Sequence, residues 1–331
     1  MKTPLTTLLN IQFPIVQAPI GSATNPILAS EVSNAGGLGM LALSWKSEQE
    51  CTDMIQATKK RTINPFGVNL VLAWNQEKRV EICIREKVPV VTFFWGDATP
   101  FIKKLQEHQV KIGQTVSNAE EAVYYEEKGV DFLIAQGWEA GGHVKGTVAS
   151  SVLVPAIAAK VNIPVVASGG FTNGEGLIAA LTLGAAGISM GTRFLMSKEA
   201  SIEANYADSI TKATENDTTY AKNLFYRGWE NAPHRVLTNS TVKKWEKAGK
   251  PKAGHRPDEQ KVIGYKANQE PILNYSDNNP IQGTTGNLEA MALYAGQSAG
   301  LLKDRIPARQ IIEQTIADAN SCLKKLDQFN L

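Results

Sequence analysis

The feature that most constrains the fold is an alternation that runs through the first two-thirds of the chain. Short runs of Val, Ile and Leu, bounded by Pro or Gly, alternate with longer stretches in which apolar residues recur every three or four positions. The short runs are typical of buried parallel strands, and the longer stretches are typical of helices that cover a sheet. The predicted strands are Ile15–Ala18, Leu38–Leu43, Phe66–Leu70, Val90–Phe94, Val110–Gln114, Phe132–Gln136, Val165–Ser168 and Gly187–Met190.

Helices are predicted between these strands. Several begin at a capping residue; Ser117 or Asn118, for example, precedes Glu120 and Glu121. The predicted helices are Asn25–Asn34, Lys103–His108, Asn118–Lys128, Val152–Lys160 and Gly176–Leu183. Eight strands that alternate with helices match a (β/α)8 TIM barrel, although an open doubly wound sheet has the same local pattern. We therefore expect an α/β fold, and a barrel fits the length of the chain.

The alternation stops after Met196. The following stretch, to about Leu288, is more polar, contains scattered aromatic residues and shows no further strand–helix rhythm. We expect an α-helical insertion after the eighth strand, so that residues 1–196 and 288–331 form the barrel and residues 197–287 cover its active site. The helices predicted here and in the returning segment are Ala200–Thr214, Tyr220–Phe225, Thr241–Ala248, Asn287–Leu301 and Ala308–Phe329.

Composition argues against several classes of function. The net charge of +2 favours neither nucleic acid nor an anionic membrane as a partner. The three cysteines, Cys51, Cys83 and Cys322, are far apart, and no cluster has the spacing of metal ligands. No apolar run reaches the length of a membrane span, and the N-terminus differs from a signal peptide. We expect a cytoplasmic protein without a metal site that acts on small molecules, and a homodimer is compatible with the sequence.

The segment Ala135–His143, which follows the sixth predicted strand, carries the densest functional signal. Residues at the C-terminal ends of barrel strands face the active site. Gly141 and Gly142 lack a β-carbon, so the backbone there can approach a flat ligand closely. A histidine at this point can hydrogen-bond a substrate or accept a proton from it. An isolated histidine more often caps a loop, but this context favours a catalytic role for His143.

Glycine turns end the last two predicted strands, at Ser168–Gly170 and Met190–Thr192. The loops after these strands form the usual phosphate site of a barrel, where backbone N–H groups receive the dianion. Either turn alone is explained by strand-to-helix geometry. Two turns at these places predict a ligand that carries a phosphate group.

Other side chains at strand ends fit the surroundings of a flat ring. An amide such as Asn69 or Gln136 can donate to and accept from the edge of a flavin, although buried amides are often structural. Three tryptophans, Trp45, Trp95 and Trp138, also fall near strand ends and are compatible either with a pocket wall or with ordinary packing. The remaining histidines, His108, His234 and His255, have surroundings that indicate structural roles.

Taken together, several segments resemble the nitronate monooxygenases, formerly called 2-nitropropane dioxygenases, within the FMN-dependent TIM-barrel superfamily. The likeness spans nearly the whole chain and is weakest between Ser197 and Gln282. The segments that carry it are Pro14–Pro19, Ser33–Gly39, Phe66–Asn69, Gln136–His143, Ser168–Phe171, Met190–Phe194 and Tyr294–Gly300.

This resemblance implies an FMN-dependent enzyme in which His143 is the catalytic histidine. The implied reaction is oxidation of alkyl nitronates, such as propionate 3-nitronate, with O2 to a carbonyl compound and nitrite. The residues expected to bind FMN are Ala18, Pro19, Ile20, Asn69, Gln136, Gly141, Gly142, Ser168, Gly169, Gly170, Ser189, Met190, Gly191 and Thr192.

The motifs leave two alternatives open. One is an NAD(P)H-dependent quinone or enoyl-thioester reductase, because FMN-dependent enoyl-acyl carrier protein reductases and some NADH:quinone reductases share most of these motifs. The other is a non-catalytic flavin-binding protein. Gln136 favours the monooxygenase, because the enoyl reductases tend to carry glutamate at the matching position. Two residues depart from the family pattern: Ser189 stands where glutamine is common, and Trp138 is bulkier than the usual residue. Both bear on the shape of the substrate pocket.

Overall fold

The structure, a computed structural model that describes residues 1–329, is built around eight parallel strands. Their order in the sheet is β1-β9-β8-β6-β5-β4-β3-β2. The two ends of the sheet meet, because Gln17 N donates to Leu38 O and Leu38 N donates to Ile15 O, each at 2.9 Å. The sheet therefore closes into the predicted TIM barrel. The strands are β1 (Ile15–Gln17), β2 (Gly39–Ala42), β3 (Phe66–Val71), β4 (Val90–Phe94), β5 (Lys111–Val116), β6 (Phe132–Gln136), β8 (Val165–Ser168) and β9 (Gly187–Met190).

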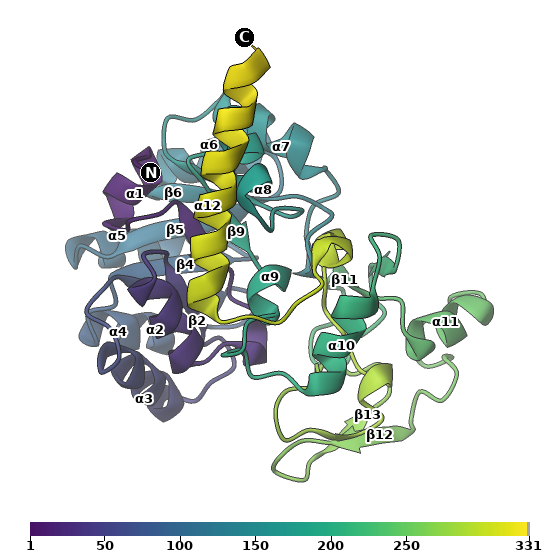
Figure 1. Cartoon of the computed structure of the whole chain (residues 1–331). Helices are drawn as coiled ribbons and strands as arrows, with labels where there is room; N and C mark the ends of the chain where they lie inside the picture. The colour runs from purple at the N-terminus through teal and green to yellow at the C-terminus, as the bar shows by residue number, and fades with distance from the viewer. Residues whose placement is uncertain (330–331) are drawn as a thin grey trace.

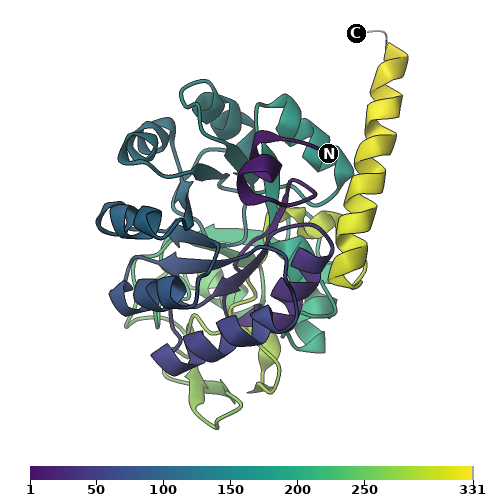
Figure 2. The same ribbon diagram turned by 90° about the vertical axis from the view of Figure 1, so that its left-hand side faces the viewer.

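Helices surround this barrel, as Figure 2 shows. All five helices predicted within the barrel are present, as α2 (Pro26–Asn34), α5 (Thr99–Glu107), α6 (Ala119–Lys128), α7 (Ser150–Ala158) and α8 (Gly174–Thr182). Four α-helices of the barrel part were not predicted: α1 (Pro4–Leu9), α3 (Glu48–Lys59), α4 (Glu77–Arg85) and the short α9 (Thr192–Leu195). Each of α3 and α4 buries three residues, and these include Cys51, Thr58 and Cys83, which are weaker apolar signals in a sequence than Leu or Ile.

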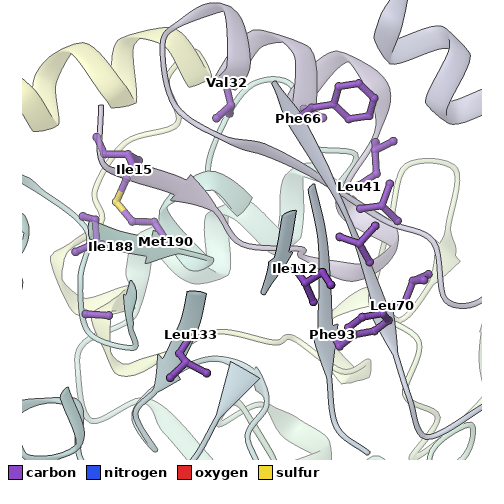
Figure 3. Packing of buried hydrophobic residues seen from close by; sticks show 14 of the residues in the cluster. Ile15, Val32, Leu41, Phe66, Leu70, Phe93, Ile112, Leu133, Ile188 and Met190 are labelled. Atoms are coloured by element: carbon purple, nitrogen blue, oxygen red, sulfur yellow. The ribbon is translucent and has the colours of Figure 1, made fainter. Parts of the chain in front are cut away.

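Two apolar layers pack on opposite faces of the strands. Side chains such as Ile112 and Leu133 point outward and pack beneath the helices (Figure 3). A separate cluster that includes Val90 and Val166 fills the barrel interior. Successive side chains of a strand alternate between its two faces. The residue two positions after each interior residue, toward the C-terminal end of its strand, therefore also faces inward. These inward residues at the C-terminal end, here named the polar collar, are Asn69, Thr92, Thr115, Gln136, Ser168 and Ser189.

The insertion lies beside the barrel mouth and contains two small antiparallel sheets (Figure 1). One sheet joins β10 (Thr218–Ala221) and β11 (His234–Leu237) to β7 (Gly142–His143), which belongs to the barrel loop after β6. The other sheet consists of β12 (Val262–Tyr265), β13 (Pro271–Leu273) and β14 (Thr285–Gly286). The α-helices of this region are α10 (Ala204–Lys212) and α11 (Ser240–Lys247).

Two of the helices predicted from residue 197 onward are wrong. The segment Tyr220–Phe225 begins as strand, because Tyr220 and Ala221 pair with β11. The segment Asn287–Leu301 forms only two short 3-10 helices, η2 (Leu288–Ala290) and η3 (Gln297–Leu301). A β-carbon on Gly296 would lie 2.8 Å from Glu139 O, so the chain is extended there against the loop after β6.

The C-terminal helix α12 (Ala308–Leu326) was predicted and runs along the outside of the barrel against α8 and α2 (Figure 1). None of the helices within residues 1–329 combines the length and apolar character that a membrane crossing requires.

Candidate functional site

Two amides of the polar collar are held at the barrel mouth by hydrogen bonds. Asn69 Nδ2 donates to Oγ1 and to the carbonyl oxygen of Thr92 on the neighbouring strand, at 3.0 and 3.2 Å. Gln136 Nε2 donates to the carbonyl oxygen of His143 at 3.2 Å. The sequence predicted both amides beside a flat ligand. In addition, Gln136 fixes the backbone that carries the predicted catalytic histidine.

The two glycine turns lie next to each other because β8 and β9 are neighbours in the sheet. Gly169 and Gly170 have φ angles of +99° and +81°, which L side chains rarely adopt. Gly191 has an ordinary φ of −93°, and a β-carbon there would meet only Ala18 and Ile20, each at 3.8 Å. Within residues 1–329, the N–H groups of Gly170 and Gly191 donate no hydrogen bond. The turns thus present free donors beside a space that glycine leaves open.

The returning segment after the insertion passes directly behind these turns. Thr192 Oγ1 accepts a hydrogen bond from Gly296 N at 3.1 Å, which leaves its own O–H free to donate. A β-carbon on Gly141 would collide with the backbone of Ala295 and Gly296. The chain itself therefore requires glycine at 141. Gly142 has a φ of +76°, and no atom lies within 4 Å of where its β-carbon would be.

His143 lies at the end of the glycine segment, in the two-residue strand β7, which pairs with β11. Its ring stacks at 4.2 Å, centroid to centroid, on the indole of Trp229, with an angle of 32° between the planes. Tyr294 and His234 are the other aromatic neighbours, at 5.5 and 5.6 Å. Within residues 1–329, the buried Nε2 atom of His143 has no hydrogen-bond partner.

Both neighbouring histidines are held in the neutral state. Burial lowers the pKa of His143 well below its usual value, and the nearby His234 lowers this pKa further. Burial also lowers the pKa of His234 to about 4. A neutral His143 can accept a proton at one ring nitrogen and donate a hydrogen bond from the other. The unpartnered nitrogen is therefore available for proton transfer or for hydrogen bonding to a ligand.

Aromatic side chains surround this histidine. The ring of Trp229 also packs against Trp74 and Trp95, each at 4.9 Å, and against Phe94 at 6.4 Å. Of the three tryptophans considered from the sequence, Trp95 belongs to this group, and Trp45 packs only on its edge, against Trp74 at 5.6 Å. The mouth beside His143 is thus mainly apolar.

The third tryptophan, Trp138, lies elsewhere. Its carbonyl oxygen accepts hydrogen bonds from the guanidinium of Arg235, and that guanidinium stacks on the indole at 4.6 Å. Tyr220 packs against the same ring at 5.8 Å. Trp138 therefore connects the loop after β6 to the insertion and does not belong to the aromatic group around His143.

Sequence reasoning missed Thr92, Trp74, Trp229 and Tyr294. Thr92 carried a detectable signal, because it alternates with the apolar residues of β4 and so faces inward with Asn69. Trp74 follows β3 in the chain and was also detectable as a strand-end aromatic. Tyr294 begins the segment Tyr294–Gly300, which carried part of the resemblance but did not indicate a place at the mouth. No local pattern places Trp229 there, because it comes from the insertion and reaches the mouth through tertiary packing.

Comparison with known proteins identifies the family of this chain. The family model described as nitronate monooxygenase matches the chain in two overlapping segments, residues 2–78 and 71–318. The chain belongs to the nitronate monooxygenase family. It is therefore a member of an oxidoreductase family, as the resemblance of its motifs implied.

Relatives of this family member carry more than one name. A protein from Rhodococcus jostii, named (3aS,4S,5R,7aS)-5-hydroxy-7a-methyl-1-oxo-octahydro-1H-indene-4-carboxyl-CoA dehydrogenase, is 33% identical over 99% of this chain and 97% of its own length. A probable nitronate monooxygenase from Staphylococcus saprophyticus is 29% identical over 98% of this chain and 99% of its own. The solved structure of FabK from Thermotoga maritima is 33% identical, covers 99% of both chains, and superposes with a TM-score of 0.86.

Proposed function

We propose that this protein is an FMN-dependent nitronate monooxygenase that converts small alkyl nitronates and O2 into a carbonyl compound and nitrite. The observation that carries the proposal is the neutral His143, whose Nε2 atom has no partner among residues 1–329 and whose ring lies among aromatic side chains at the barrel mouth. Membership of the family and the probable nitronate monooxygenase relatives support the same activity.

The mouth fits FMN. The free N–H groups of Gly170 and Gly191, with the hydroxyl of Thr192, would receive its phosphate, and Gly191 leaves the space that close approach requires. The amides of the polar collar, Asn69 and Gln136, would meet the polar edge of the ring. When bound, the flavin supplies the acceptor for the electrons of the nitronate and passes them to O2.

His143 would act on the substrate through its unpartnered nitrogen. A nitronate carries negative charge on its oxygens, and a neutral imidazole N–H directed at these oxygens stabilises that charge. Because the aromatic neighbours exclude water, this hydrogen bond is stronger than it would be in solvent. For a neutral nitroalkane, the same nitrogen in its unprotonated form would accept the proton from carbon. Its lowered pKa keeps this form present at neutral pH.

The test is nitrite release by FMN-loaded protein that is mixed with a nitronate in air. We expect nitrite from propionate 3-nitronate or ethyl nitronate, and a loss of about 10²- to 10⁴-fold in kcat/KM for His143→Ala. His108→Ala is the matched control, because His108 is exposed at the end of α5 and should leave turnover unchanged. Absence of nitrite would contradict the activity, and an unimpaired His143→Ala variant would contradict the role of the histidine.

A second candidate, an oxidoreductase acting on acyl thioesters, is favoured by the Rhodococcus jostii relative named as a CoA dehydrogenase. The two candidates differ in the compound that reduces the flavin. Rapid mixing without oxygen should bleach the flavin with a nitronate if the first is right. Bleaching by NADH, NADPH or an acyl-CoA, with a nitronate inert, would instead support the second.

A further inference from the structure

One side chain of the insertion fills the space beside His143. Trp229 is only 7% exposed, whereas Gly228, Glu230 and Asn231 around it are exposed to solvent. Its indole thus turns inward from the tip of a loop, residues 228–231, that otherwise faces water. The ring enters a socket, here named the aromatic socket, whose members are Trp74, Phe94, Trp95 and His143.

The walls of the aromatic socket belong to the barrel. Phe94 ends β4 and Trp95 follows it directly, while Trp74 lies in the loop after β3. Because β4 is paired with β3 on one side and β5 on the other, Phe94 and Trp95 at its end have little freedom to move away from a larger group. Of the five rings, only Trp229 comes from the insertion. The space available beside His143 therefore depends on this one side chain.

The tip that carries Trp229 is short and anchored on both sides. On one side, Asp277 N donates to Arg227 O at 3.0 Å. On the other side, His234 Nδ1 hydrogen-bonds the carbonyl oxygen of Ala232 at 2.8 Å. Positive φ angles of +117° at Gly228 and +56° at Asn231 turn the chain between these anchors. The indole is thus held at a defined depth in the mouth.

We propose that Trp229 is the specificity-determining residue of this enzyme and limits the alkyl group of the substrate that reaches His143. The inference rests on the proposed function, because it concerns the substrate of that site. An alkyl chain attached to a group held by His143 has to share the aromatic socket with the indole. Short chains would lie alongside it, and longer chains would collide with it, because Phe94 and Trp95 are held in place at the end of β4.

The experiment measures nitrite release from a series of nitronates from nitroethane to 1-nitrohexane. In the wild type, kcat/KM should fall as the alkyl group lengthens. In Trp229→Ala, the ratio of kcat/KM for the hexyl to the ethyl compound should rise about tenfold or more, since methylene groups then enter an apolar space. Trp229→Phe should give an intermediate ratio, and it replaces Trp229→Ala as the test if the alanine variant folds poorly.

Trp45→Ala is the matched control, because Trp45 is 51% exposed and contacts the aromatic socket only through Trp74. Its ratio should equal that of the wild type. If neither folded Trp229 variant changes the ratio by more than about twofold, Trp229 does not set the size of the substrate.

A second measurement separates failure of this inference from failure of the proposed function. Cavities left by removal of a buried apolar side chain can bind small aromatic molecules. Indole should therefore raise the melting temperature of Trp229→Ala and leave that of the wild type unchanged. If no nitronate is a substrate, the proposed function fails, and this shift alone then decides whether the aromatic socket accepts a ligand. A Trp229→Ala variant that indole does not stabilise would overturn the inference.

Discussion

At the scale of single residues, the chemistry of the mouth depends on two histidines that remain neutral together. His234 is completely buried, and its Nδ1 hydrogen-bonds the carbonyl oxygen of Ala232 while its Nε2 accepts from Phe225 N at 3.1 Å. Protonation of Nε2 would break the second bond and place a charge 5.6 Å from the ring of His143. A charged His234 would repel a proton on His143, so the neutral state of His234 leaves its neighbour better able to accept one.

The same burial predicts that stability falls in acid. The pKa of His234 is about 4 in the fold and about 6.5 in an unfolded chain, so the unfolded chain binds the extra proton between these values. The contribution of the neutral His234 to the free energy of unfolding is on the order of 3 kcal/mol. It is fully present above about pH 6.5 and is lost as the pH falls toward 4. His143 acts in the same direction. Asp277, whose pKa burial raises to about 6, opposes it, because its folded form gains a proton first.

Urea unfolding at about pH 7 and about pH 5 measures this effect. We expect His234→Gln to be less stable than the wild type at neutral pH, because the hydrogen bond to Phe225 N is disturbed. Its further loss between the two pH values should be smaller than that of the wild type. Equal losses would show that His234 is not the source. Asp277→Asn is the companion variant, and its loss in acid should be larger than that of the wild type.

At the scale of elements, the strands were predictable and the mouth was only partly so. Runs such as Val90–Phe94 are mostly apolar and lie between a Pro and a Gly, Pro89 and Gly96, which marks their limits in the sequence and in the structure. The strand β7 consists of two residues and exists only because β11 pairs with it. Its sequence, Gly142–His143, contains no strand signal. The loop after β6 was therefore recognised by its residue types, whereas its partner in the insertion was not.

The turn after β9 offers a sharp test of the cofactor site. Gly191→Ala should not destabilise the fold, because φ is −93° and the new β-carbon would make only ordinary contacts with Ala18 and Ile20. If the phosphate of FMN approaches this backbone, the methyl group should lower the affinity of the apoprotein for FMN about tenfold or more, a change of about 1.4 kcal/mol. Quenching of flavin fluorescence during titration measures the affinity.

Gly249→Ala is the control for this variant. Gly249 has a φ of +80° and no atom within 4 Å of its β-carbon, so alanine there should cost about 1 kcal/mol of stability and leave FMN binding unchanged. Gly191→Ala should thus weaken FMN binding without a loss of stability, and Gly249→Ala should lower stability without a loss of FMN binding. An FMN affinity that Gly191→Ala leaves intact would place the phosphate elsewhere.

At the scale of the whole molecule, the barrel and the insertion share one hydrophobic cluster. It combines Ala23 and Leu195 of the barrel with Tyr206 and Leu237 of the insertion and Leu293 of the returning segment. The strand pairing of β7 with β11 adds a second connection, next to the predicted catalytic histidine. Since the aromatic socket receives Trp229 from the insertion, the geometry of the mouth depends on both parts being folded at once.

We therefore expect one unfolding transition for the whole chain. Tryptophan fluorescence, which reports largely on the mouth, and far-UV circular dichroism, which is sensitive to the helices around the barrel, should change at the same temperature. Tyr206→Phe should lower this temperature by about 2 °C in both signals, because it removes a buried hydrogen bond of 2.6 Å to Tyr294 O that contributes about 1 kcal/mol. A fluorescence transition that precedes the loss of helix, or that alone responds to Tyr206→Phe, would mean that the insertion unfolds separately. In that case the substrate site would be lost while the barrel persists.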